Sequence, residues 1–255
     1  MAVVGRLDGQ VALITGGEGS VGMATARAFI REGCRVVVAG ISEDGLTAAR
    51  KELGDEVAAF SRTDVTDAAS VRAAVARAVG RFGRLDVVFS NAGIAGVIAP
   101  VADYPDDEFD RVLAVHVRGA FLTCKYGLHA LPDGGRIIIN SSVVGLTADP
   151  GIIAYATAKH ALVGLMRTLA KEVASRAIRV NTIHPGPIDN DFQRAIEVAA
   201  TGSPADYAAE VFNEMIPLRR HATPDEIAAA VLFLAGPESS FMTGATLVVD
   251  GGMSV

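Results

Sequence analysis

Three side chains of the sequence have the types and the spacing to move a proton on or off an alcohol. Tyr155 and Lys159 stand four residues apart at the start of an apolar run that predicts a helix, so both project from one face. An ammonium beside a phenol favours the phenolate, and we expect Lys159 to lower the pKa of Tyr155 from its usual value of about 10. The hydroxyl of Ser142 would hydrogen-bond the same substrate oxygen. Taken singly, each residue also has an ordinary interpretation, as a core tyrosine, a solvated lysine or a strand-end serine.

A glycine-rich turn near the start of the chain has the form of a phosphate-binding loop. Residues 11–14 are an apolar run typical of a buried strand, residues 15–22 read Thr-Gly-Gly-Glu-Gly-Ser-Val-Gly, and residues 23–31 predict a helix. Glycines let the backbone approach a pyrophosphate, and the helix N-terminus supplies free N–H groups and the positive end of a dipole. The pattern Gly-x-Gly-x-x-Gly between the first strand and the first helix favours a dinucleotide-binding fold.

Apolar runs and amphipathic segments alternate along the rest of the chain, which is typical of an α/β protein. Strands are predicted at residues 11–14, 35–39, 57–60, 85–89, 136–140, 178–183 and 246–249, and helices at 23–31, 68–82, 106–131 and 155–176, with another beginning at a capping box at 223–226. We expect one doubly wound parallel sheet of about seven strands, a Rossmann fold, in a single domain over residues 1–255. The irregular stretch 188–220 predicts a small helical lobe that binds substrate.

Composition and charge exclude several classes of protein. A net charge of -6 and a pI near 5.4 give no basic footprint for nucleic acid. No apolar run is long enough for a membrane span, and residues 1–10 lack the pattern of a secretory signal. Neither the histidines nor Cys34 and Cys124 have metal-ligand spacing, so we expect no metal and two buried, reduced thiols. These features predict a cytoplasmic protein with a small-molecule substrate.

Together these motifs resemble the short-chain dehydrogenase/reductase family, over nearly the whole chain. The resemblance implies a nicotinamide dinucleotide cofactor and hydride transfer between an alcohol and a ketone. It makes Ser142, Tyr155 and Lys159 the catalytic residues, with Lys159 also holding the ribose hydroxyls, and Asp64 the carboxylate that contacts the adenine amino group. The residues expected to bind the cofactor are Gly16, Glu18, Ser20, Val21, Gly22, Ile41, Asp64, Val65, Asn91, Ala92, Gly93, Tyr155, Lys159, Pro185, Gly186, Ile188 and Asn190.

The chain departs from the family's pattern at several positions. Ser20 replaces the middle glycine of the loop, beside Gly19, so we expect an adapted loop. His116 stands where the family has an asparagine that kinks a helix and holds a water in a proton relay. We expect the imidazole to serve this relay as a fourth catalytic residue and to titrate near neutrality, the alternative being an ordinary helix residue. Asn190 replaces a threonine that contacts the carboxamide, and an amide donates and accepts similarly.

The end of the second strand bears on the choice between NAD and NADP. There the sequence Gly40-Ile41-Ser42 offers neither a carboxylate for a ribose hydroxyl nor a basic side chain for a 2′-phosphate. No lysine or arginine stands at positions 17–20 or 40–44, whereas Glu18, Glu43 and Asp44 would repel a phosphate. We predict NAD, with NADP as the less favoured alternative, for which Ser42 would be the phosphate contact.

The expected substrate wall is apolar and consists of Ile94, Val144, Ile152, Phe192 and Phe212. Such a wall suits a hydrophobic secondary alcohol or ketone. Two other functions stay open: an NADPH-dependent reductase of 3-oxoacyl thioesters on acyl carrier protein, and a non-catalytic dinucleotide-sensing or scaffold protein. The family resemblance also implies a homotetramer.

Overall fold

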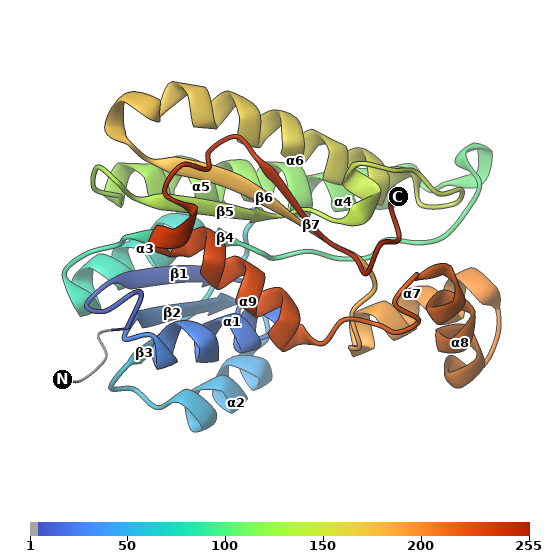
Figure 1. The fold of residues 1–255 in the computed structure, drawn as a ribbon, viewed down its shortest axis with the longest axis horizontal. Coiled ribbons are helices and arrows are strands. Elements are labelled where there is room, and N and C mark those ends of the chain that lie inside the picture. The colour runs from blue at the N-terminus through green and yellow to red at the C-terminus, as the bar shows by residue number, and fades with distance from the viewer. Residues whose placement is uncertain (1–4) are drawn as a thin grey trace.

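The computed structural model describes residues 5–255, which form a seven-stranded sheet with helices on both faces (Figure 1). The strands are β1 Val11–Thr15, β2 Arg35–Gly40, β3 Ala58–Arg62, β4 Val87–Ser90, β5 Arg136–Asn140, β6 Arg179–Pro185 and β7 Thr246–Val249. Their order is β3-β2-β1-β4-β5-β6-β7, and every pair is parallel. The predicted doubly wound sheet is therefore confirmed. The first four residues of the predicted domain lie outside the described part.

The central strands are apolar throughout because helices cover both faces of the sheet. Leu13 of β1 stands opposite Val37 of β2 on one side and Val88 of β4 on the other, and all three are fully buried. The chain leaves β1 towards β2 in one direction and later returns to place β4 on its other side. This reversal of strand order opens a crevice at the carboxyl ends of β1 and β4, where parallel α/β sheets bind ligands.

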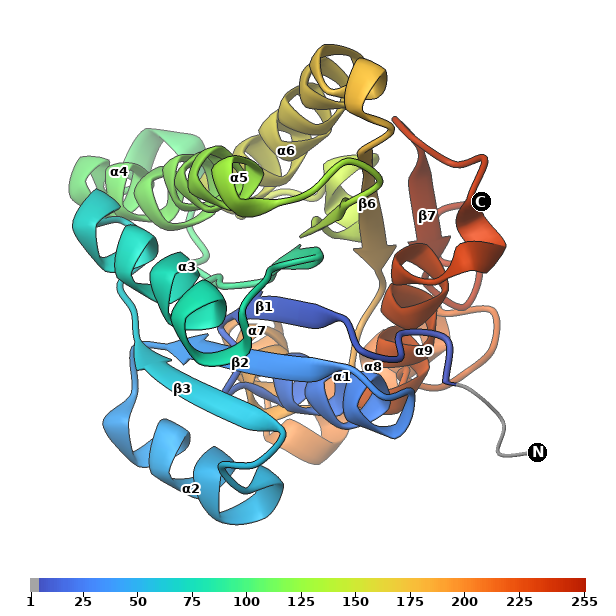
Figure 2. The same ribbon diagram turned by 90° about the vertical axis from the view of Figure 1, so that its left-hand side faces the viewer.

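Two helical layers flank the sheet (Figure 2). Helices α1 Ser20–Arg31, α2 Glu43–Leu53 and α9 Pro224–Ala235 cover one face, and α3 Ala68–Phe82, α5 Gly119–Ala130 and α6 Ile153–Glu172 cover the other. Phe29 fills the core on the α1 side, and Met166 fills the core on the α6 side. The helix predicted at 23–31 begins three residues earlier, at Ser20, because the last three residues of the glycine-rich motif are already helical.

Two helical segments differ from the sequence predictions. The predicted long helix at 106–131 is present over Asp106 to Ala130, but it contains a π-helical turn, Ala114–Arg118, between α4 Asp106–Leu113 and α5. Such π turns often mark functional sites, and this one contains the buried His116. Helix α2 was not predicted, because it buries only Leu46 and Ala49 and so lacks a clear apolar stripe.

The lobe consists of α7 Asp191–Thr201 and α8 Ala205–Met215, which stand beyond the carboxyl ends of the strands (Figure 1). Both helices lie inside the stretch 188–220 that was predicted to form it. Among residues 5–255, no helix combines the length and the apolarity that crossing a membrane would require.

Candidate active site

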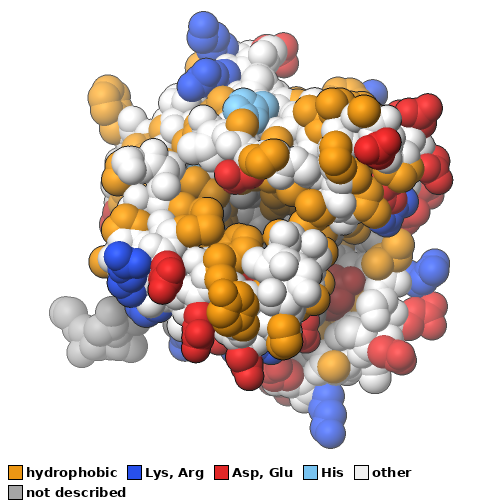
Figure 3. Space-filling model, turned by 90° about the vertical axis from the view of Figure 1, so that its right-hand side faces the viewer, with side chains coloured by type: hydrophobic (Ala, Val, Ile, Leu, Met, Phe, Trp, Pro, Cys, Tyr) orange, Lys and Arg blue, Asp and Glu red, His pale blue; other side chains and the backbone are white. Residues whose placement is uncertain are grey.

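A cavity of about 690 Å³ extends from the glycine-rich loop, past the carboxyl ends of β1, β4 and β5, to the lobe. Figure 3 shows a hollow on this face, bordered largely by hydrophobic side chains. The predicted catalytic residues Ser142, Tyr155, Lys159 and His116 all line the cavity. So do the five predicted substrate residues and every predicted cofactor residue except Gly22. The structure thus brings nearly the whole predicted site around one space.

Gly22 lies one layer behind the cavity wall. A Cβ on Gly22 would stand 2.5 Å from the carbonyl oxygen of Gly16 and 2.6 Å from Cα of Gly17. The residue is therefore glycine because helix α1 packs directly on the loop that precedes it.

The glycine-rich loop suits a pyrophosphate. Gly19 is the N-cap of α1 and places no side chain over the helix end, so the first-turn N–H groups stay free for an anion. Ser20 and Val21 of this turn line the cavity. The side-chain amide of Asn91 donates to the carbonyl oxygens of Thr15 and Gly16, at 3.1 Å each, and fixes the loop against β4.

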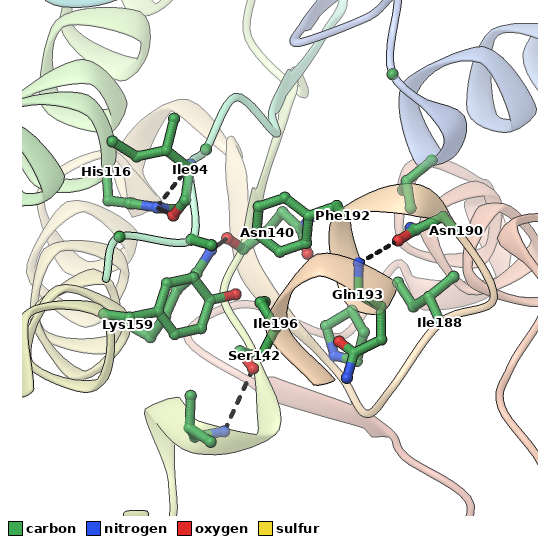
Figure 4. A pocket seen from close by; sticks show the side chains of 18 of the residues that line it. Ile94, His116, Asn140, Ser142, Lys159, Ile188, Asn190, Phe192, Gln193 and Ile196 are labelled. Atoms are coloured by element: carbon green, nitrogen blue, oxygen red, sulfur yellow. Dashed lines mark hydrogen bonds between the residues drawn. The ribbon is translucent and has the colours of Figure 1, made fainter. Parts of the chain in front are cut away.

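The predicted catalytic side chains line one part of the cavity, and Figure 4 shows His116, Ser142 and Lys159 around it. Nζ of Lys159 donates to the carbonyl oxygen of Asn140 at 2.9 Å and lies 5.2 Å from the ring centroid of Tyr155. The Ser142 hydroxyl stands two residues past the end of β5, where it accepts from the amide of Val144 at 3.4 Å and lines the same cavity as Tyr155. The set therefore forms from two elements, with α6 supplying the phenol and the amine and the β5 end supplying the hydroxyl.

Burial controls the charges of this pair. It raises the pKa of Tyr155 to about 12 and lowers the pKa of Lys159 to about 7. The expectation that Lys159 lowers the pKa of Tyr155 is therefore wrong for this site. A fully buried amine loses much of its charge, and a phenolate in the same apolar surroundings is costly, so desolvation outweighs the attraction between the two groups.

His116 packs edge-on against Tyr155, with ring centroids 5.3 Å apart. Its Nε2 faces the backbone of Ile94, at 2.7 Å from the carbonyl oxygen and 3.1 Å from the amide nitrogen (Figure 4). Burial and the charge of Lys159 lower its pKa to about 3, so the expected titration near neutrality is wrong. Nδ1 is buried without a hydrogen-bond partner among the described residues, so one ring nitrogen is available to a water or ligand.

Sequence reasoning missed two supporting residues. Asn140, the last residue of β5, holds Lys159 with its carbonyl oxygen and donates through Nδ2 to Oδ1 of Asn91 at 2.9 Å. His184 of β6 donates through Nδ1 to the carbonyl oxygen of Ser142 at 2.8 Å. Both polar side chains stand at or near the carboxyl end of a strand, which is the signal that could have found them.

Two of the departures from the family's pattern contact each other. Oδ1 of Asn190 accepts from the amide of Gln193 at 2.8 Å and caps α7, while Nδ2 donates to Oγ of Ser20 at 3.0 Å. The lobe and the glycine-rich loop are therefore joined by a hydrogen bond between Asn190 and Ser20.

In the described part of the chain, no three histidine, cysteine, aspartate or glutamate side chains cluster as metal ligands would. Cys34 and Cys124 are free and buried, as expected, and burial raises the pKa of both thiols to about 12.

Comparison with known proteins gives relatives along the whole chain. A family model described as enoyl-(acyl carrier protein) reductase matches residues 16–254. Momilactone A synthase of Oryza sativa subsp. japonica is 37% identical over 255 residues, covering 98% of this chain and 92% of that protein. D-threitol dehydrogenase of Mycolicibacterium smegmatis is 35% identical and covers 98% and 95%, and 3-oxoacyl-[acyl-carrier-protein] reductase of Thermotoga maritima is 35% identical and covers 98% and 100%.

Solved structures agree in fold and identify the class of cofactor. Levodione reductase superposes with a TM-score of 0.94 at 34% identity, covering 98% of this chain and 99% of the other. An NAD+-bound xylitol dehydrogenase gives 0.90 at 35% identity, covering 96% and 99%. A blue fluorescent protein in complex with NADPH gives 0.88 at 33% identity, covering 98% and 100%. With these relatives and this site, the chain belongs to the short-chain dehydrogenase/reductase family of oxidoreductases that use a nicotinamide dinucleotide.

Proposed function

We propose that the protein transfers a hydride between a nicotinamide dinucleotide and a hydrophobic secondary alcohol or ketone, with Tyr155 as the acid/base. The observation that carries this proposal is the place of Ser142, Tyr155 and Lys159 in the cavity. They lie between a loop suited to phosphates and a wall of apolar side chains. A substrate whose carbon skeleton is apolar would fit against Phe192 and Phe212 and present its oxygen to Tyr155.

Each side chain has a distinct task in this reaction. When bound, the nicotinamide supplies the hydride acceptor or donor. Tyr155 moves the proton at the substrate oxygen, and Ser142 hydrogen-bonds the same oxygen. A phenol is ordinarily protonated at neutral pH, and burial raises the pKa of Tyr155 further, so Tyr155 can donate a proton to a ketone. Lys159, held by Asn140, is positioned for the ribose hydroxyls, and the free Nδ1 of His116 would hold a water of the proton relay.

NAD is the proposed cofactor. Of the described residues that line the cavity, Lys159 is the single lysine or arginine, and it lies at the catalytic end. The adenosine end is lined instead by Glu18 and Asp64, which would repel a 2′-phosphate. The test is titration with NADH and with NADPH, followed by a screen of cyclic and open-chain secondary alcohols with NAD. Tight NADH binding and oxidation of apolar alcohols are expected, whereas binding of neither dinucleotide would contradict the proposal.

The second candidate is an NADPH-dependent 3-oxoacyl thioester reductase. The Thermotoga maritima relative, a 3-oxoacyl-[acyl-carrier-protein] reductase, favours it. If the protein turned over acetoacetyl-coenzyme A with NADPH faster than apolar ketones with NADH, the thioester reductase would become the favoured function. A non-catalytic dinucleotide sensor would bind NADH and turn over no member of either substrate panel.

We also propose that the protein is a cytoplasmic homotetramer. Phe121 on α5 and Phe241 near β7 expose large apolar side chains, with Phe241 fully exposed, and association of copies would cover them. The two free thiols suit a reducing compartment. Light scattering on the purified protein gives the number of copies directly, and a monomer would contradict this assembly.

A further inference from the structure

The carboxylate that is missing from the end of β2 is supplied by the glycine-rich loop. Gly40 ends β2, and a Cβ built there would overlap the carboxylate group of Glu18. The Glu18 side chain thus fills the space that a side chain at position 40 would occupy. Its Oε1 accepts from the amides of Ile41 at 2.8 Å and Ser42 at 3.3 Å, which fixes the carboxylate at the end of the strand.

Two glycines make room for this carboxylate. Neither Gly40 nor Gly45 has the positive φ that would call for glycine on conformational grounds. Gly45 lies inside α2, where glycine is unfavourable by about 0.5–1 kcal/mol relative to alanine. A Cβ on Gly45 would stand 2.9 Å from Cγ of Glu18. The backbone around β2 and α2 is therefore shaped to admit the Glu18 side chain.

The second oxygen of the carboxylate lacks a partner. Oε2 of Glu18 is buried and accepts no hydrogen bond from the described residues, although Glu18 lines the cavity. A buried polar atom left unpaired is costly, and more so when it carries charge. The surrounding cavity includes Gly16, Ile41 and Asp64, the end of the site remote from Tyr155. A hydroxyl donor from a ligand at this end would satisfy the free oxygen.

We propose that Glu18 selects NAD over NADP, because its Oε2 accepts a hydrogen bond from the 2′-hydroxyl of the adenosine ribose. This inference rests on the proposed dinucleotide-dependent function and assigns specificity to a residue outside the strand that usually carries it. A 2′-phosphate would bring negative charge against a carboxylate held by two backbone amides. Arg62 of β3 stands opposite Gly40 in the sheet, and its Nε already pairs with Oε1 of Glu43 at 3.3 Å.

The decisive variant is Glu18→Gln. Its amide oxygen can still accept from Ile41, so the loop keeps its anchor, but an NH2 donor replaces the free carboxylate oxygen. We expect the dissociation constant for NADH to rise about tenfold and that for NADPH to fall, because a hydrogen bond to a charged acceptor is worth about that factor or more. Emission of the reduced nicotinamide reports binding directly, since the chain contains no tryptophan.

A pair of substitutions tests whether the carboxylate can be moved from position 18 to position 40. Gly40→Asp alone places a second carboxylate on top of Glu18, so both dinucleotides should bind more weakly. Combining it with Glu18→Gly should restore the preference for NADH. The matched control is Glu52→Gln on the neighbouring helix α2, whose exposed carboxylate pairs with Arg27, and it should leave the NADH to NADPH ratio unchanged.

The outcomes separate this inference from the function on which it rests. Equal weakening of both dinucleotides in Glu18→Gln would mean that Glu18 only anchors the loop, and a wild-type preference for NADPH would also overturn the assignment. Either result leaves the oxidoreductase function standing. Wild-type protein that binds neither dinucleotide would instead refute the proposed function.

Discussion

The two ends of the cavity are built in different ways. At the cofactor end, the walls are the ends of strands whose residues are almost wholly buried, such as Ile14 of β1 and Phe89 of β4. In the lobe, α7 buries only Glu197 and α8 buries only Ala208. The cofactor end therefore shares the stability of the main core, whereas the lobe has little apolar packing of its own.

A polar network takes the place of a core in the lobe. The two ring nitrogens of His221 face Oε1 of Glu197 at 2.5 Å and Oδ1 of Asn213 at 2.8 Å, and Nε2 of Gln193 donates to the same Glu197 oxygen at 3.0 Å. The side chain of His221 is only 11% exposed and ties α7 to α8. Under the proposed function, the cofactor would therefore bind to a preformed surface, while the substrate would bind beside a lobe held by hydrogen bonds that a few substitutions can remove.

The largest expected effect is on turnover and comes from Tyr155, which lies between the cofactor end and the lobe. Tyr155→Phe removes the proton donor and should lower kcat by about 10²–10⁴-fold, because that is the usual contribution of a positioned acid/base. The dissociation constant for NADH should hardly change, since the loop and strand ends stay intact. Steady-state turnover and a binding titration on the same sample check both parts, and retained turnover would show that Tyr155 is not the acid/base.

A substitution in the main core, on the α1 side of the sheet, should cost the most stability. Phe29 on α1 is fully buried, so Phe29→Ala should lower the free energy of unfolding by about 3–5 kcal/mol. Urea unfolding measures the change. A cost below about 1 kcal/mol, the range of a surface substitution, would contradict the picture of one tight core behind the cofactor surface.

Glu197→Gln weakens the lobe without touching the cofactor end. It removes the charge from the centre of the polar network, and we expect a loss of about 1–3 kcal/mol in stability together with a higher KM for the substrate. The NADH dissociation constant should stay the same. Asp206→Asn, an exposed change in α8, is the control. A matching rise in the NADH dissociation constant would mean that the two ends are coupled more tightly than their packing suggests.

The buried amine of Lys159 should make the free energy of unfolding depend on pH. The pKa of Lys159 falls from 10.5 to about 7 on burial, so between these pH values the unfolded chain binds more protons than the folded chain. Without dinucleotide, this group makes the free energy of unfolding rise with pH from about 7 to about 10.5, by at most about 1.4 kcal/mol per pH unit, and its full penalty remains below that window. Subtracting the profile of Lys159→Met isolates the slope, and superimposable profiles would show that Lys159 keeps its ordinary pKa.

The smallest expected change in stability belongs to the substrate wall. Phe192 is 40% exposed and lines the cavity, so Phe192→Ala should alter the free energy of unfolding by less than about 0.5 kcal/mol. The KM for an apolar substrate should still rise several-fold, because the side chain contributes contact area to the ligand. Thermal unfolding measures the change in stability, and kinetics with one apolar ketone measure the change in KM. An unchanged KM would show that Phe192 does not contact the substrate.

The same contrast explains what the sequence could predict. Ser142 and Asn91 follow buried apolar runs, and the carboxyl ends of parallel strands meet at one edge, so their convergence could be inferred without coordinates. The overlap of the Glu18 carboxylate with the side-chain space at Gly40 could not be predicted from the sequence. It depends on how far one side chain reaches from a loop to a neighbouring strand.

Electrostatic expectations failed for a related reason. The spacing of Tyr155 and Lys159 gives their proximity but not their burial, and burial sets the pKa values of both. The same holds for His116, which no sequence pattern identifies as sealed beneath the loop at Ile94. Charge states therefore follow from the packing of elements that are far apart in the chain.

The overlap between Glu18 and position 40 limits how this protein can change by single mutations. A chain that first gains a carboxylate at position 40 passes through a form with two acidic groups competing for one space. A chain that first loses Glu18 passes through a form with none. On the proposed role of Glu18, either order crosses an intermediate that recognises the ribose less well, so the arrangement with the carboxylate on the strand and the arrangement with it on the loop are separated by a barrier in the mutational landscape. The position of this carboxylate would then depend on the ancestry of a protein as well as on the chemistry of the ribose.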